Sequence, residues 1–224
     1  MTKIEAITMA IAIIGGIAGP WGAYTAYDAL KFKQPFDEHD QTAKSYIAQI
    51  ASAENRKDAS EVIRVRLLYE GFEEKWRAAR QIAQLVAPIE SLAVTKLTAE
   101  QSENLKGLFA KASEGSSQPS LPPKTLGAAY FAIKDYEGAV AQLNAVSGKN
   151  GDPRTLALKA AAYSELASTV ADKSAKANYE TAAVESYSAA LKAAKGSSEL
   201  SGFAVANPSL KSVLDNRGIE LTNR

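Results

Sequence analysis

The side chains best suited to bind a metal ion gather around the single histidine of the chain. His39 stands with Asp37, Glu38 and Asp40 in the segment KQPFDEHD. Imidazole and carboxylate groups are common metal ligands, but neighbours in sequence seldom converge on one ion without a loop built for it. We therefore favour a solvated linker or a helix start for this segment, and we predict no metal site.

Motifs for covalent chemistry are sparse in the sequence. There is no cysteine nucleophile, and no serine–histidine–aspartate arrangement is available beyond the histidine of the linker. Neither a GxxxxGK[ST] phosphate loop nor a GxGxxG fingerprint occurs, and Gly15, Gly16 and Gly19 do not follow a strand. A convergent carboxylate pair stays open, although no spacing argues for one. We predict that the protein is not an enzyme and has no catalytic residue and no cofactor.

Length and composition favour a helical protein. The 224 residues suffice for one or two domains, and 46% of them are hydrophobic, enough for a core. Alanine is abundant while alternating valine, threonine and aromatic residues are sparse, which favours helices over strands. Lysine and arginine number 26 against 25 acidic residues. Because nucleic-acid binding needs clustered positive charge, we expect no nucleic-acid partner.

An apolar segment opens the chain at residues 4–27 and is long enough to cross a bilayer as a helix. Its isoleucines are followed by aromatic residues, which favour the lipid–water interface. We predict that residues 1–33 form a membrane anchor and that the membrane is a partner. The anchoring side chains would be Ile7, Ile11, Ile14, Trp21, Tyr24 and Tyr27.

Two other interpretations of this segment are weaker. A cleaved signal peptide is disfavoured because Glu5 occupies the region that should be positive, and no small-residue cleavage site follows. A helix buried in soluble protein is the second alternative. In a membrane helix or in a buried soluble helix, Gly15 and Gly19 would let two helices approach closely, so a homo-oligomer is possible. Lys31 and Lys33 favour the cytoplasm over the periplasm for the C-terminal domain.

Residues 34–112 are predicted to form a helical hairpin or bundle. Helical periodicity begins near Thr42, and residues 55–58 are a polar break. A long helix should begin near Ala59 and carry an apolar seam with alternating steps of four and three residues. We expect core packing, and no aromatic binding site, at this seam. Its members are Val65, Tyr69, Phe72, Trp76, Ala79, Ala83 and Val86.

Proline, helix-capping residues and a serine- and proline-rich stretch divide the rest of the chain. Pro88 should end or bend the long helix. Thr98 and Gln101 have the spacing of a capping box, which predicts a helix over residues 99–112. Residues 113–123, rich in serine and proline, form the best internal boundary, so residues 124–224 would be a separate region.

Residues 124–146 read as two short antiparallel helices joined at Asp135. Gly127 and Ala139 are small where the two backbones must come close, whereas Tyr130 and Leu143 are large where the gap widens. This alternation resembles the tetratricopeptide repeat, a paired-helix module, although a proline stands where that family usually has tryptophan. The resemblance implies a stack of helical pairs that binds protein or peptide partners.

A second, looser pair follows. Asp152 and Pro153 form a good helix start, and about eleven more residues separate its two halves than in the first pair. Either both helices are longer or residues 171–175 form a longer loop. The resemblance covers residues 121–216. In the first helix of this second pair the large-small-large face is Leu156, Ala160 and Tyr163. The second helix would carry Ala183, Tyr187 and Ala190, and a cap would use Phe203, Leu210, Val213 and Leu214.

In this family the first helix of each pair lines a concave groove. Carried over to this chain, Lys124 and Arg154 could grip a carboxylate of a partner. The alternative for each residue is ordinary solvent-facing charge. The groove residues implied by the resemblance are Lys124, Ala128, Phe131, Arg154, Ala161, Ser164 and Glu165.

Three functions are consistent with these patterns. We favour a membrane-anchored helical-repeat adaptor or scaffold for protein–protein interaction, similar in layout to bacterial single-pass tetratricopeptide proteins. The alternative is a soluble α-helical scaffold or oligomer whose apolar N-terminal helix is buried. A membrane-active effector that associates through Gly15 and Gly19 is the third hypothesis.

Overall fold

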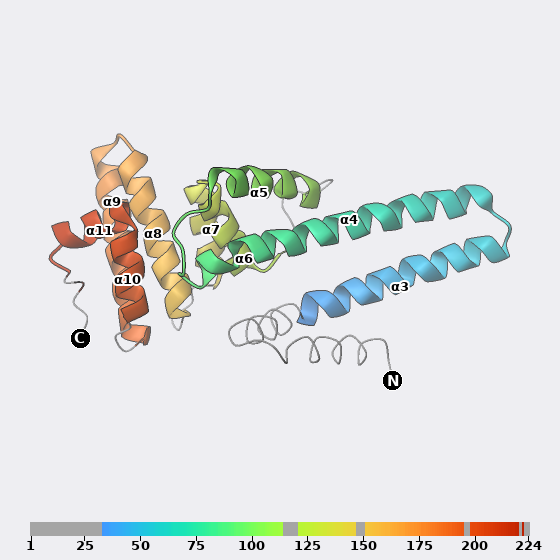
Figure 1. The fold of residues 1–224 in the computed structure, drawn as a ribbon, viewed down its shortest axis with the longest axis horizontal. Helices are drawn as coiled ribbons and strands as arrows, with labels where there is room; N and C mark the ends of the chain where they lie inside the picture. Colours follow the sequence, from blue (N-terminus) through green and yellow to red (C-terminus); the bar gives the residue numbers. More distant parts are fainter. Residues whose placement is uncertain (1–32, 114–120, 147–150, 195–197, 220, 222–224) are drawn as a thin grey trace. The chain divides into compact units, whose positions relative to one another are not determined.

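The computed structural model describes residues 33–113, 121–146, 151–194, 198–219 and 221 (Figure 1). Within these ranges the regular elements are nine α-helices, with no strand. The all-α prediction is therefore confirmed for the described residues. None of the helices in these ranges combines the length and the apolar character that crossing a bilayer requires. The predicted anchor at residues 4–27 lies outside them.

Two compact units divide the chain, Met1–Phe72 and Glu73–Arg224. In the first unit, helix α3 (Lys33–Asn55) and the start of α4 (Ala59–Glu90) form an antiparallel hairpin. The break predicted at residues 55–58 is confirmed: Lys57 has a φ of 59°, and the Asp58 carboxylate accepts a hydrogen bond of 3.0 Å from the backbone N–H of Glu61.

Aromatic side chains hold the hairpin together. The Tyr46 ring lies 6.0 Å from that of Tyr69 and 5.7 Å from that of Phe72. His39 stacks on Phe72 at 5.0 Å. Of the two interpretations of KQPFDEHD the structure has the helix start: α3 begins at Lys33, earlier than the periodicity near Thr42 indicates. Proline is tolerated in a first helical turn, so the proline of KQPFDEHD does not prevent an early start.

Helix α4 runs on into the second unit, where its apolar seam is deeply buried. Val86 is fully buried, and Ala79 and Ala83 are nearly so. Pro88 lies inside the helix, close to its last residue. The predicted end of the helix is therefore right to within a turn. Leu92, with a φ of 60°, then redirects the chain.

Local signals place the next helix, α5 (Ala99–Ala112), as predicted. The Thr98 hydroxyl accepts from the backbone N–H of Gln101 at 3.1 Å, and the Gln101 side chain accepts from the backbone N–H of Thr98 at 3.0 Å. This reciprocal pair is the predicted capping box. The predicted boundary at residues 113–123 falls largely on residues 114–120, outside the described ranges, and stays a prediction.

The first predicted helical pair consists of α6 (Pro123–Ala132) and α7 (Tyr136–Val146). Lys134, with a φ of 66°, makes the turn between them. The reason for a glycine at position 127 is close packing. A Cβ added there would lie 2.6 Å from Cγ of Leu143, so only glycine lets this leucine seat against α6.

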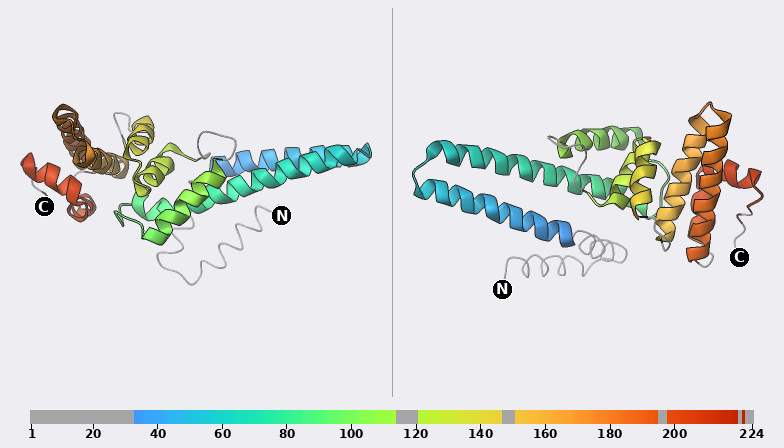
Figure 2. Two further views of the ribbon diagram at one scale, coloured as in Figure 1. Left: turned by 90° about the horizontal axis from the view of Figure 1, so that it is seen from above. Right: turned by 180° about the vertical axis from the view of Figure 1, so that it is seen from behind.

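The second pair consists of α8 (Pro153–Thr169) and α9 (Lys173–Ala194), which lie side by side (Figure 2). Asp152 caps α8 by accepting from the backbone N–H of Thr155 at 3.2 Å. The additional residues of this pair lengthen both helices, to 17 and 22 residues, and the connection between them is short. The alternative of a longer loop at residues 171–175 is therefore wrong.

Helices α10 (Ser198–Ala206) and α11 (Pro208–Asn216) complete the second unit. Tyr187 of α9 is fully buried, and its hydroxyl donates a hydrogen bond of 3.0 Å to the backbone carbonyl of Leu200. The residues expected to cap the stack, Phe203, Leu210, Val213 and Leu214, are all buried. One hydrophobic cluster includes residues of α4 to α11 within this unit.

Candidate functional site

Three of the predicted groove residues belong to the core of the second unit. Ala128 and Ala161 are fully buried, and Ser164 is 1% exposed, with its hydroxyl donating to the carbonyl of Ala161 at 2.7 Å. They offer no surface to a partner, so the structure does not place them on an open groove. Alanine and serine fit an exposed concave face and a tight helix contact equally well, which is why sequence did not separate the two.

The two predicted basic residues already hold carboxylates of this chain. Lys124 Nζ donates to Asp152 Oδ2 at 2.7 Å. The Arg154 guanidinium binds Glu199 through Nε at 2.9 Å and a terminal nitrogen at 3.2 Å. Lys124 therefore joins α6 to the start of α8, and Arg154 joins α8 to α10. Their predicted role toward a partner's carboxylate stays a prediction.

The Lys124 interaction changes the protonation of the helix cap. Burial alone would raise the pKa of Asp152. The hydrogen bond and charge of Lys124, with hydrogen bonds from Thr155, outweigh burial and lower this pKa below its usual value. Asp152 is thus held as a carboxylate where it caps α8 and binds α6.

The remaining two predicted residues, Phe131 and Glu165, are brought together at a cleft in the second unit. The cleft has a volume of about 610 Å³. Its walls come from the N-terminal half of α5 and the segment before it, from the end of α6 with its turn, from α8, and from Asn207. A second hollow of about 470 Å³ shares Lys134, Tyr136 and Glu165 with the first.

Aromatic residues form part of the floor of the cleft. Phe131 is 5% exposed and meets the Tyr136 ring edge-on at 5.6 Å. Burial raises the pKa of Tyr136, and the negative charge of Glu165 raises it further. The phenol therefore stays protonated at neutral pH and can donate a hydrogen bond at the point where the two hollows meet.

Several charged side chains line the two hollows without an ion pair to any described residue. They include Lys96 from the segment before α5, Lys134 from the α6–α7 turn and Glu165 from α8. Lys106, by contrast, binds Glu103 at 3.3 Å on the surface of α5. The lining can thus form ion pairs and hydrogen bonds with a bound molecule.

Sequence reasoning missed the lysines of this cleft. Lys134 was detectable in principle, because it directly precedes the predicted turn at Asp135. Lys96 was not, because its position depends on how the segment after α4 packs on helices that lie far ahead in the sequence.

As for metal binding, no cluster of histidine and acidic residues suited to an ion occurs among the described residues.

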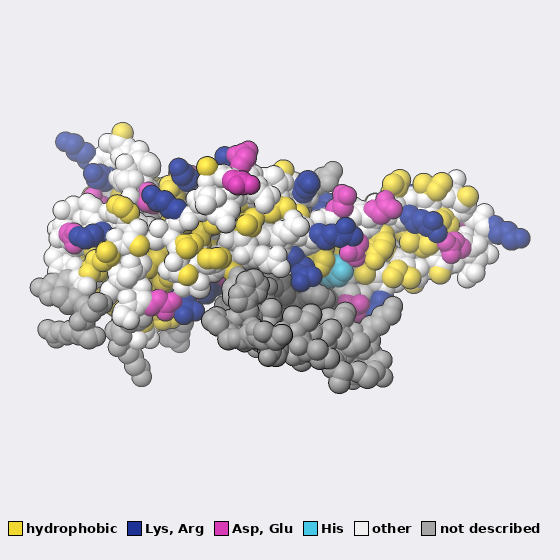
Figure 3. Space-filling model, in the orientation of Figure 1, with side chains coloured by type: hydrophobic (Ala, Val, Ile, Leu, Met, Phe, Trp, Pro, Cys, Tyr) yellow, Lys and Arg dark blue, Asp and Glu magenta, His cyan; other side chains and the backbone are white. Residues whose placement is uncertain are grey.

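A second feature is the apolar surface of the hairpin. Hydrophobic side chains are visible along it in Figure 3. Four large aliphatic residues are between 47% and 63% exposed, namely Ile47, Ile63, Leu67 and Leu68. Such residues normally lie in a core or an interface.

No protein-family model, curated protein or solved structure matches this chain. The likeness to tetratricopeptide repeats is therefore carried by the residues of the helical pairs alone.

Proposed function

We propose that the chain is a helical scaffold that binds a protein or peptide partner through its second unit and is tethered to a membrane by its N-terminal segment. The observation that carries this proposal is the cleft at the junction of α5, α6 and α8. Its volume of about 610 Å³ lies within the range of pockets that take small molecules, so it offers room for a few side chains of a partner.

The architecture around the cleft supports a binding role. The first helical pair, α6 with α7, lines the cleft with the end of α6, the turn and Tyr136, and the second pair contributes Glu165 of α8. Stacked helical pairs of this kind commonly offer rigid concave surfaces to protein partners. A preformed site needs little ordering when the partner arrives, so more of the contact energy remains as affinity.

The tether is supported by the position of the apolar segment, which directly precedes α3. Membrane fractionation tests it. We expect the full chain to need detergent for extraction, and a chain without residues 1–30 to be released without it. A full chain that stays in the aqueous fraction would remove the tether from the proposal.

The exposed aliphatic residues of the hairpin favour a second candidate, a soluble scaffold in which the N-terminal segment covers them. Residues 1–32 are directly joined to α3 and could fold back on it. Proteolysis in detergent-free solution separates the two candidates: protection of residues 4–27 would favour the covered hairpin, and rapid cleavage there would favour the tether.

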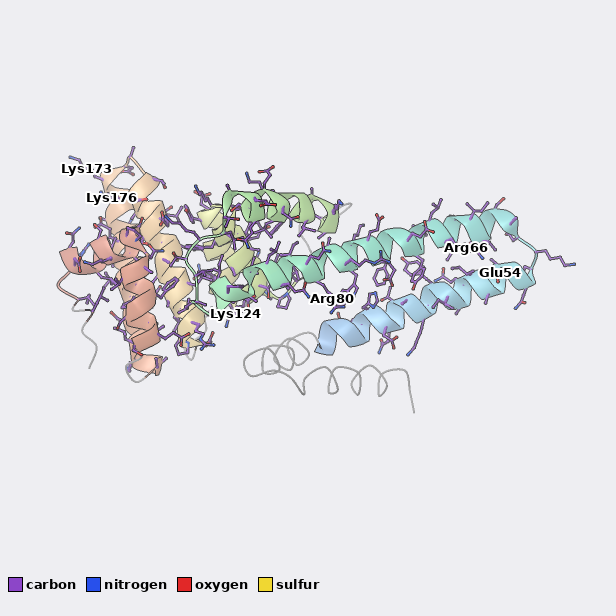
Figure 4. The ribbon with its side chains drawn as sticks, in the orientation of Figure 1. Glu54, Arg66, Arg80, Lys124, Lys173 and Lys176 are labelled. Carbon is purple, nitrogen blue, oxygen red and sulfur yellow. The ribbon has the colours of Figure 1, made fainter. Side chains whose placement is uncertain are left out.

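Partner binding is tested by photo-crosslinking in cells with the full chain. A photoreactive amino acid replaces Lys134 at the cleft, or Lys173 at the start of α9 as a matched surface control (Figure 4). We expect a discrete protein adduct from position 134 and none from position 173. Absence of a protein adduct at position 134, and at further positions along the cleft such as Lys96 and Lys106, would overturn the proposed function.

A further inference from the structure

The geometry of the cleft points to the chemistry of its occupant. We propose that the two hollows bind an extended peptide segment of the partner that carries an acidic side chain at one end and a basic side chain at the other. The acidic side chain lies in the larger hollow and the basic one in the smaller. This inference rests on the proposed function and adds the kind of sequence that the cleft selects.

Positive charge dominates the larger hollow. Lys96, Lys106 and Lys134 line it against Glu103 and Glu165. Lys106 and Glu103 neutralise each other at 3.3 Å, which leaves Lys96 and Lys134 without a carboxylate among the described residues. A carboxylate bound here would form charge-assisted hydrogen bonds that the unbound lysines lack.

Negative charge dominates the smaller hollow. Asp135, Glu137 and Glu165 line it against Lys134 alone. Asp135 also caps α7 by accepting from the backbone N–H of Gly138 at 2.9 Å, and this hydrogen bond fixes the position of its carboxylate. Glu137 and Glu165 form no ion pair with a described residue, so an ammonium or guanidinium group of the partner is the complementary ion.

Apolar side chains also line the larger hollow and suit a main chain passing across it. Leu97, Phe131 and Ile133 line the larger hollow, and Tyr136 lies where both hollows meet. In an extended segment alternate side chains point to opposite sides, so a charged residue can enter a hollow while an apolar neighbour rests on Phe131. The Tyr136 hydroxyl can donate to a carbonyl of the bound segment.

Selection from a random-peptide phage library tests the inference directly, with the full chain in detergent micelles as bait. We expect enriched peptides to combine an acidic and a basic residue within one short window. The bait variant with Lys96→Glu and Lys134→Glu should lose the preference for the acid and keep that for the base. The variant with Glu137→Lys and Glu165→Gln should lose the preference for a basic residue and keep the preference for an acidic one.

The control bait carries Lys173→Glu and Lys176→Glu, the same charge change on α9 (Figure 4). It should enrich the same peptides as the parent chain. For one enriched peptide, the Lys96→Glu and Lys134→Glu bait should raise the dissociation constant about tenfold or more, while the control leaves it within about twofold.

Enrichment without a charge pattern, or a pattern unchanged by the cleft variants, would overturn the inference. The proposed function has its own readout, the adduct at position 134. An adduct there combined with charge-independent peptides would reject the dipolar segment and retain the scaffold. No adduct and no enriched peptides would reject both.

Discussion

The hairpin and the second unit use the same long helix in opposite ways. In residues 38–72 the buried hydrophobic side chains are Ala43, Ala53 and Val65, and large aliphatic residues remain exposed. In the second unit α4 contributes Ile82, Val86 and Ile89 to a continuous core. A pair of packed helices encloses few large side chains, whereas stacked pairs enclose many.

This difference bears on function. Regions with few buried contacts open at low free energy, and densely packed ones open close to the global free energy of unfolding. The cleft is built from the dense unit, so we expect it to have the same shape with and without the proposed partner. The hairpin is suited to a different role, in which its apolar surface is completed by another segment or surface.

The same truncation in both units should have unequal effects, and this is the largest difference we expect. Tyr187→Ala removes a fully buried ring and its hydrogen bond to Leu200, so it should lower the free energy of unfolding by about 3–5 kcal/mol. Tyr46→Ala removes a half-buried ring from the hairpin and should lower it by about 1 kcal/mol. Urea denaturation followed by circular dichroism measures both.

Equal losses of unfolding free energy for the two variants would mean that the hairpin is as well enclosed as the second unit.

Tyr187→Phe isolates the contribution of the hydroxyl and should lower the free energy of unfolding by about 1 kcal/mol. Burial raises the pKa of Tyr187 despite an opposing hydrogen bond with Ser201. The folded chain thus holds this proton more tightly than the unfolded chain, and stability should fall as pH rises above about 10, the usual tyrosine pKa. Tyr187→Phe should weaken that fall.

Glycine-to-alanine changes should have opposite signs at Gly127 and at Gly71. Gly127→Ala places a Cβ 2.6 Å from Leu143 Cγ, and overpacking of this kind should destabilise the chain by about 1–3 kcal/mol. Gly71→Ala in the hairpin meets nothing within 4 Å, and the better helix propensity should stabilise it by about 0.5–1 kcal/mol.

Thermal unfolding of both variants checks the sign of each effect, and Gly107→Ala, at an open position in α5, is measured beside them. A stabilising Gly127→Ala would show that Leu143 can move aside at no cost, and the close packing of α6 on α7 would then be wrong. Combining Gly127→Ala with Leu143→Ala should destabilise by less than the sum of the two changes, because the clash disappears with the leucine.

The cap of α8 should contribute a smaller, pH-dependent amount. Asp152→Ala removes the cap and the partner of Lys124 and should destabilise by about 1 kcal/mol at neutral pH. Because the pKa of Asp152 is lowered in the folded chain, its contribution is present above about pH 4, the usual aspartate value, and is lost as pH falls further.

Asp152→Asn is the matched control, since asparagine caps helices as well as aspartate does but carries no charge. It should stay closer to the parent than Asp152→Ala and should remove this part of the acid dependence. Identical acid denaturation of the parent and of Asp152→Asn would show that the Lys124 pair contributes nothing.

The smallest effect is expected at the surface of the hairpin. Arg66 and Glu54 meet at 2.8 Å between α3 and α4, but both side chains are more than half exposed (Figure 4). A double-mutant cycle with alanine should give a coupling of about 0.2–1 kcal/mol that decreases with added salt. A larger, salt-independent coupling would indicate that the hairpin is shielded from water.

Local signals made the helices predictable. The Thr98 capping box and the Asp152 cap with Pro153 each mark a helix start that the structure has. These signals act between residues close in sequence, so no knowledge of the fold is needed to interpret them.

Long-range packing limited what could be predicted about the site. Phe131 and Glu165 were named on a family pattern, and both line the cleft. Ala128 and Ala161 followed from the same pattern yet lie in the core, because the side chains that cover them are set by tertiary contacts. The start of α3 stayed undecided between a linker and a helix, because its polar residues are equally common in both.

Hydrogen–deuterium exchange of the full chain in detergent micelles tests most directly whether the unit that holds the cleft is the preformed, stable part. We predict the slowest amide exchange in α8 and α9, and faster exchange in α3 than in any described helix that lines the cleft. Exchange in α3 as slow as in α8 would contradict this view and would indicate that the hairpin is covered.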